Sequence, residues 1–204
     1  MGRPGGPRES AGRARPACPA APRGRPRRAR DAAVVDLFRH HAWANDQLLA
    51  ACEGLPPDHL EWVTQGTYGG LGATLRHLVE AEERYVVRLR GEPARPGPAP
   101  DMPDPPSPPE ALAPSVRVLR RRAATSGAEL IALAERLEPG TMLTTTFRDE
   151  PAEVPATVVF AQALDHGGEH RTQVRHALTI LGYEPPDIDA WAWHEMLIAP
   201  DEGA

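Results

Sequence analysis

The sequence predicts an all-α protein, an antiparallel four-helix bundle with a small irregular or hairpin insertion before the fourth helix. Apolar residues recur at three- and four-residue steps in four long segments, as they do on the buried face of an amphipathic helix. Glycine and proline residues separate these segments. Connections of variable length between long helices are typical of helical bundles.

The N-terminal segment, residues 1–30, is predicted to be a disordered tail. It holds nine arginines and one glutamate among many proline, glycine and alanine residues, and it has little apolar surface to offset the entropy lost on folding. One interpretation is a basic arm for nucleic acid or a membrane surface, and the other is an extension without function. The helical domain is expected to span residues 31–198.

The first two long helices are predicted over residues 31–53 and 71–90, joined by a loop over residues 55–70. Each has one apolar face with helical periodicity. Polar His41 and Asn45 lie in the middle of that face in the first helix. Buried polar groups need partners, so we expect these two side chains to form hydrogen bonds inside the domain.

A proline-rich linker is predicted over residues 92–109. Ser107 and Glu110 have the spacing of a capping box, which marks the start of a helix. The third helix is therefore predicted over residues 107–138, although Pro114 can break its first turns.

The fourth long helix is predicted over residues 156–181. Before it, residues 144–147 can form one strand of a small hairpin, with its turn at residues 148–151. A short aromatic helix with Trp191 and Trp193 follows.

Charge and cysteine content narrow the classes of function that the protein can have. Outside the N-terminal segment there are 14 arginines and 27 acidic residues. This net negative charge argues against nucleic-acid binding by the folded part. No apolar run approaches the ~20 residues of a membrane span. Cys18 and Cys52 do not form a disulfide framework, so a reducing, cytoplasmic location is expected.

The strongest chemical signal is the pair His166 and His170, one turn apart on the fourth helix. Both rings leave the same side of the helix and can reach one divalent ion at ~2.0–2.1 Å. Such a pair also occurs by chance. Between them, Gly167 and Gly168 weaken the helix, which indicates either close approach of another group or a locally weak helix.

Three stretches together resemble the DinB-like (DinB/YfiT-like) family. They are residues 38–49 (FRHHAWANDQLL), residues 72–82 (GATLRHLVEAE) and residues 165–174 (DHGGEHRTQV). Their order and spacing fit the family across roughly residues 32–195.

The resemblance implies a four-helix bundle, often dimeric, that holds one divalent ion. It assigns the metal ligands to His77, His166 and His170. The ion can be zinc, nickel or iron-type. Relatives include S-transferases that use bacillithiol and a mycothiol-dependent maleylpyruvate isomerase, so a low-molecular-weight thiol is a candidate co-substrate.

Periodicity alone would not select His77, because it lies off the main apolar stripe of its helix, and a solvated helix histidine is the other interpretation. It shares a side with small Thr74 and Ala81, which could leave room for a metal and a substrate. Three imidazoles would leave an open position at the ion, as in catalytic sites. An ion of this kind lowers the pKa of water or a thiol, which favours a metal-dependent S-transferase or hydrolase. The alternative is a non-catalytic metal-binding or stress-related interaction protein.

Three further residues are candidates for supporting the ion or binding a cofactor or substrate: His41, Asn45 and Arg171. Arg171 can equally form a salt bridge. No catalytic residue is assigned, and three acidic residues near the ligands in sequence are interpreted as surface charges: Glu80, Asp165 and Glu169. The expected partners are a small-molecule substrate and a second copy in a homodimer.

Overall fold

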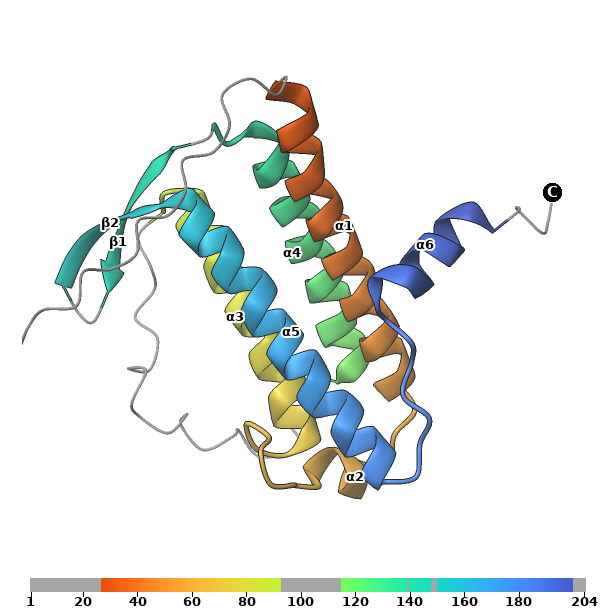
Figure 1. Cartoon of the computed structure of the whole chain (residues 1–204). Coiled ribbons are helices and arrows are strands. Elements are labelled where there is room, and N and C mark those ends of the chain that lie inside the picture. Colours follow the sequence, from red (N-terminus) through yellow and green to blue (C-terminus); the bar gives the residue numbers. More distant parts are fainter. Residues whose placement is uncertain (1–26, 93–114, 139, 148–149, 200–204) are drawn as a thin grey trace, which may run out of the picture.

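The computed structural model describes residues 27–92, 115–138, 140–147 and 150–199, and it is mostly helical (Figure 1). The long helices are α1 (Arg27–Cys52), α3 (Leu71–Leu89), α4 (Val116–Arg136) and α5 (Ala156–Ile180). The short elements are α2 (Pro57–Glu61), the strands β1 (Met142–Phe147) and β2 (Glu150–Pro155), and the helix α6 (Ala190–Ile198).

Each of the four long helices packs against two of the others, so that the four surround a common interior. Helix α1 contacts α4 and α5, and α3 contacts the same two helices. Figure 1 shows the four lying side by side. Each helix therefore turns one face toward the interior, as the apolar periodicity predicts.

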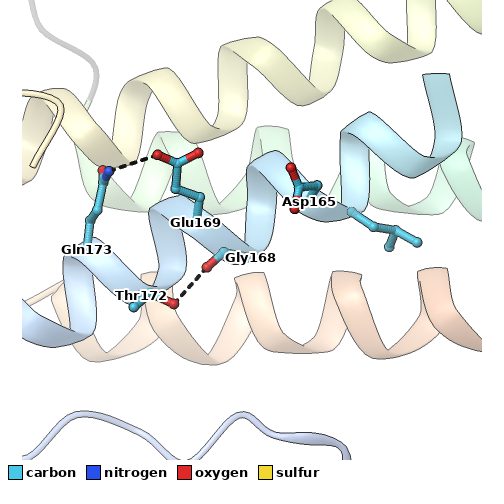
Figure 2. Close-up of a pocket in the computed structure, with 6 residues that line it drawn as sticks. Asp165, Gly168, Glu169, Thr172 and Gln173 are labelled. Carbon is cyan, nitrogen blue, oxygen red and sulfur yellow. Dashed lines mark hydrogen bonds between the residues drawn. The ribbon is translucent and has the colours of Figure 1, made fainter. Parts of the chain in front are cut away.

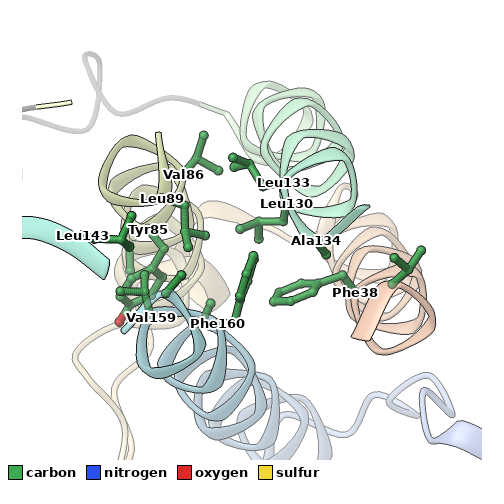
Figure 3. Packing of buried hydrophobic residues seen from close by; sticks show 14 residues of the cluster. Phe38, Tyr85, Val86, Leu89, Leu130, Leu133, Ala134, Leu143, Val159 and Phe160 are labelled. Carbon is green, nitrogen blue, oxygen red and sulfur yellow. The ribbon is translucent and has the colours of Figure 1, made fainter. Parts of the chain in front are cut away.

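Two apolar clusters fill the interior, one on either side of a polar layer. One cluster contains Phe38, Leu130 and Phe160 (Figure 3), and the other contains Leu48 and Leu178. Every long helix contributes to both clusters. On α1, α4 and α5, the residues of the polar layer and the candidate site lie between the two apolar sets. On α3, they are interleaved with the apolar residues, since His77 lies between Leu75 and Val79, and Glu82 directly follows Ala81.

The helix ends follow local rules, and two of them differ from the sequence prediction. Helix α1 begins at Arg27, inside the segment predicted to be a disordered tail, and the rest of that tail lies outside the described residues. Helix α4 begins at Val116, because Ser115 is its N-cap and the Ser115 hydroxyl accepts from the Val118 amide. The capping box at Ser107 and the linker beyond Glu92 also lie outside the described residues.

The predicted loop over residues 55–70 contains a helix that the sequence prediction missed. Helix α2 is one short turn that begins with Pro57 at its first position, where proline needs no hydrogen-bond partner. Five residues are too few for helical periodicity to be visible in the sequence.

The hairpin before the fourth helix is confirmed, with longer strands than predicted. Strands β1 and β2 are antiparallel, and Met142 pairs with Pro155 at their open end. Helix α5 follows β2 directly, and the Ala156 amide donates to the Thr141 carbonyl. The hairpin thus leads the chain into the helix that carries two of the candidate ligands.

The C-terminal segment returns to α1. The His40 ring donates to the Ile188 carbonyl at 2.9 Å, and His59 bonds the Tyr183 hydroxyl at 2.8 Å. These two histidines therefore hold the chain that leads into α6. Across the described part of the chain, every helix is too short or too polar to cross a bilayer.

Candidate metal centre

Three imidazole rings from two helices meet at one point between α3 and α5. The Nε2 atom of His166 lies 3.1 Å from Nε2 of His77 and 3.1 Å from Nε2 of His170. One nitrogen of each ring lies within 4.8 Å of the others. The sequence prediction required His77 to lie beside the other two rings, and the structure places it there.

Packing of α3 on α5 creates this convergence. His166 and His170 leave the same side of α5, and their ring centroids are 4.3 Å apart. On α3, His77 faces them next to the buried Thr74 and Ala81. These small neighbours leave room for three rings between two helices.

The donor set fits a divalent ion. Three imidazoles that bind one ion at ~2.0–2.1 Å with tetrahedral geometry place neighbouring nitrogens ~3.3 Å apart, close to the 3.1 Å separations here. The Gln173 side-chain oxygen lies 2.8 Å from His170 Nδ1. Because an amide oxygen only accepts, His170 Nδ1 donates to it, and Nε2 is the ring nitrogen that faces the centre.

Burial keeps the central ring neutral. Desolvation, followed by the neighbouring His170 and His77, lowers the pKa of His166 to about 3. Metal ligation requires neutral imidazole, so His166 is in its ligating form at neutral pH.

Two residues that the sequence prediction did not single out support the ligands. Gln173 accepts from His170 Nδ1, and such a bond to the outer ring nitrogen commonly fixes the orientation of a metal-binding histidine. It lies three residues after His170 on the same helix, a spacing that could have indicated it. The ring of Tyr68 stacks on the His77 ring, and since Tyr68 lies in a loop, no periodic pattern indicated it.

A buried polar network lies next to the three imidazoles and joins all four long helices. His41 and Asn45 of α1 both donate to the Glu82 carboxylate of α3 at 2.8 Å. Ser126 of α4 also donates to Glu82, and Arg171 of α5 donates to the Asn45 side-chain oxygen at 2.9 Å. The predicted group of His41, Asn45 and Arg171 is thus brought together, and its polar atoms bind one another and Glu82.

The Arg171 guanidinium is a half-buried cation in this network. Burial lowers its pKa to about 10, and the Glu82 carboxylate opposes that shift. Arg171 therefore remains charged at neutral pH. A partly buried cation is tolerated when it has hydrogen-bond partners and a nearby carboxylate, and Asn45, His41 and Glu82 supply them here.

The two glycines between the ligand histidines differ in their surroundings. A Cβ atom on Gly167 would lie within van der Waals overlap of His41 Cε1, whereas one on Gly168 would have no atom closer than Arg171 Nη2 at 4.0 Å. Gly167 is therefore required by the close approach of α1. Gly168 has no such reason, and the interpretation as a locally weak helix fits it.

This difference predicts that alanine at position 167 and alanine at position 168 change the stability of the protein in opposite directions. We expect Gly168→Ala to stabilise the protein by up to ~1 kcal/mol through helix propensity. Gly167→Ala is expected to destabilise it by about 1–3 kcal/mol because the methyl group overpacks the core. Urea unfolding of the two variants measures both effects, and equal midpoints would contradict the assignment.

Two of the three carboxylates near the ligands in sequence are exposed, and the third, Glu80, is half-buried. Asp165 and Glu169 are exposed and line a shallow depression on α5 with Thr172 and Gln173 (Figure 2). Of the residues that line the depression, Gln173 contacts a candidate ligand, since its side-chain oxygen bonds His170 Nδ1. Of the tryptophans, Trp193 and Trp43 lie around His40, and Trp191 is 76% exposed.

Comparisons with known proteins give the family of the chain and a solved structure of similar fold. The family model described as "DinB family" matches residues 29–202. The crystal structure of a DinB-like protein, YjoA, from Bacillus subtilis is similar in fold, with a TM-score of 0.52 and 15% sequence identity. The similarity covers 77% of this chain and 98% of that chain. No curated protein matches the sequence.

Proposed function

Because the chain belongs to the DinB family, we propose that it binds one divalent ion through His77, His166 and His170 and is a metal-dependent enzyme. The observation that carries the proposal is the approach of three Nε2 atoms from two helices to a common point. Zinc, nickel and iron-type ions suit an all-imidazole donor set.

The ion would supply Lewis-acid chemistry, lowering the pKa of a thiol or a water molecule at the open position. The chain's own residues have supporting tasks. Gln173 orients His170, and the network around Glu82 holds α1 and α5 in position. We assign Arg171 to holding the network rather than to binding an anionic substrate, because its guanidinium bonds Asn45 and His41.

A small-molecule thiol suits this site better than a thiol of the domain itself. The described residues contain one cysteine, Cys52, which is fully buried in an apolar cluster. Burial raises the pKa of its thiol to about 12, so it is a poor nucleophile at neutral pH. The S-transferase form of the proposal therefore uses a low-molecular-weight thiol. The hydrolase form uses water.

The proposal includes two structural parts. The four long helices would form the antiparallel bundle that the resemblance implies, and two copies would form a homodimer. Exposed apolar residues on α6 support self-association; they are Trp191, Leu197 and Ile198.

Elemental analysis combined with a transfer assay tests the proposal. We expect about one ion per chain in the purified protein, because three imidazoles share one centre. We also expect metal-dependent adduct formation between an electrophile and bacillithiol, mycothiol or glutathione, or metal-dependent hydrolysis. A chelator should abolish both metal content and turnover. A preparation without bound metal, before or after addition of zinc, nickel or iron(II), would contradict it.

The alternative is a non-catalytic metal-binding or stress-related interaction protein. The observation in its favour is the position of the nearby carboxylates, since Asp165 and Glu169 face the surface depression instead of the imidazoles. It predicts an ion that stabilises the fold and no turnover with any thiol or hydrolysable substrate.

A further inference from the structure

Tyr68 covers one side of the three-histidine site. Its ring stacks on the His77 imidazole, with ring centroids 3.7 Å apart and planes 19° apart. The same ring meets His170 edge-on at 5.8 Å and 80°. Tyr68 is 38% exposed, so one part of it contacts the imidazoles and another part faces solvent.

Hydrogen bonds between residues before and after Tyr68 in the sequence hold the loop that carries it. The Thr67 hydroxyl lies 2.8 Å from the Thr64 carbonyl and 2.9 Å from the Gly69 carbonyl. Gly66 has a φ of 87°, a left-handed conformation that suits glycine. Val63 forms an isolated bridge with Gly70, which closes the loop just before α3. The loop therefore presents the tyrosine ring at a defined place above His77.

Stacking at this place has a direct consequence for a ligand histidine. An imidazole binds an ion well only when its ring is held in the right orientation, and outer partners of a ligand provide that restraint. A flat ring at 3.7 Å blocks rotation of the His77 ring on that side. The electron-rich face of a tyrosine also attracts positive charge, which an imidazole gains when it donates its lone pair to an ion.

We propose that Tyr68 is a positioning residue of the metal centre, which holds the His77 imidazole in its ligating orientation by ring stacking. This inference rests on the proposed function, since it assigns His77 to an ion. The proposed function concerns the atoms that bind the ion, whereas this inference concerns the aromatic face of Tyr68, which holds one ligand ring in place. The Tyr68 hydroxyl is not needed for it.

The test compares Tyr68→Leu with Tyr68→Phe in the full chain, with Co²⁺ as the probe. Affinity is measured by competition with a chromophoric chelator, and geometry by the Co²⁺ d–d absorption and the shifted imidazole N–H resonances in NMR. Phenylalanine keeps the ring, so we expect its affinity within about 2-fold of wild type. Leucine removes it, and we expect a 10–100-fold loss, as for other outer partners of a ligand histidine.

Val63→Ala is the matched control, because Val63 lies in the same loop and is 64% exposed. It should leave affinity and spectrum unchanged, and the metal-free Tm of all variants should agree. Wild-type affinity in Tyr68→Leu would overturn the inference while leaving the proposed function intact. An equal loss in Tyr68→Phe and Tyr68→Leu would also overturn it, because the hydroxyl would then be responsible. Absence of Co²⁺ binding by wild type would overturn the proposed function and this inference together.

Discussion

Replacing His170 with alanine is expected to abolish the proposed metal binding, while replacing His176 with alanine is expected to preserve it. His170 is buried, and its Nε2 atom faces the centre 3.1 Å from His166 Nε2. Loss of one of three imidazoles leaves two ligands. We therefore expect affinity to fall by more than the 10–100-fold typical of outer-partner mutations. Metal content per chain after dialysis is the measurement.

His176 provides a matched control, because it is an exposed histidine on the same helix. The His176→Ala substitution removes the same atoms as His170→Ala, but at a position outside the candidate metal centre. Ion binding to the folded state alone raises the unfolding free energy by mass action. Wild type and His176→Ala should therefore gain Tm when metal is added, and His170→Ala should not. Full retention of metal in His170→Ala would exclude His170 as a ligand.

Replacing Glu82 with leucine is expected to destabilise the protein by about 3–5 kcal/mol, the range for removal of one partner from a buried charged network. Glu82 is 3% exposed and accepts hydrogen bonds from three side chains on two other helices: His41 and Asn45 of α1, and Ser126 of α4. Without it, three polar side chains lose their shared partner, and the Arg171 cation, which bonds His41 and Asn45, loses the nearby carboxylate. The unfolding free energy from urea titration measures the effect.

Glu83→Leu is the corresponding control on the adjacent residue. Glu83 pairs with Arg122 at 2.6 Å, but both side chains are about one-third exposed, and ion pairs of this kind contribute ~0–1 kcal/mol. Glu82→Gln retains the volume and one accepting oxygen, so its loss should lie between those of the two leucine variants. A Glu82→Leu variant as stable as Glu83→Leu would show that the network does not stabilise the fold.

The sequence located the long helices because helical periodicity is a local property of the chain. Apolar spacing and glycine or proline stops placed α3 and α5 within about one residue of their observed ends. The same pattern could not show α2, which is too short. The start of α4 was predicted too early, because Ser107 and Ser115 both suit an N-cap and the structure uses Ser115.

The residues of the candidate site differ in how well the sequence predicts them. His166 and His170 follow from their spacing on one helix. His77 required the family resemblance, because it lies off the apolar stripe and nothing local distinguishes it from a solvated histidine. His41 and Asn45 were recognisable as polar residues on a buried face, but their partner Glu82 was not, since an acidic residue on a helix is usually exposed.

By itself the sequence determined which segments are helical, which faces are apolar and which two histidines share a side of α5. Tertiary structure alone decided that His77 meets them, that Tyr68 stacks on His77 and that the network around Glu82 links four helices. The reason is physical. Periodicity fixes the direction of a side chain around its own helix axis, but the rotation and axial position of one helix against another depend on the packing of all four. Contacts between helices exist only once that packing is complete.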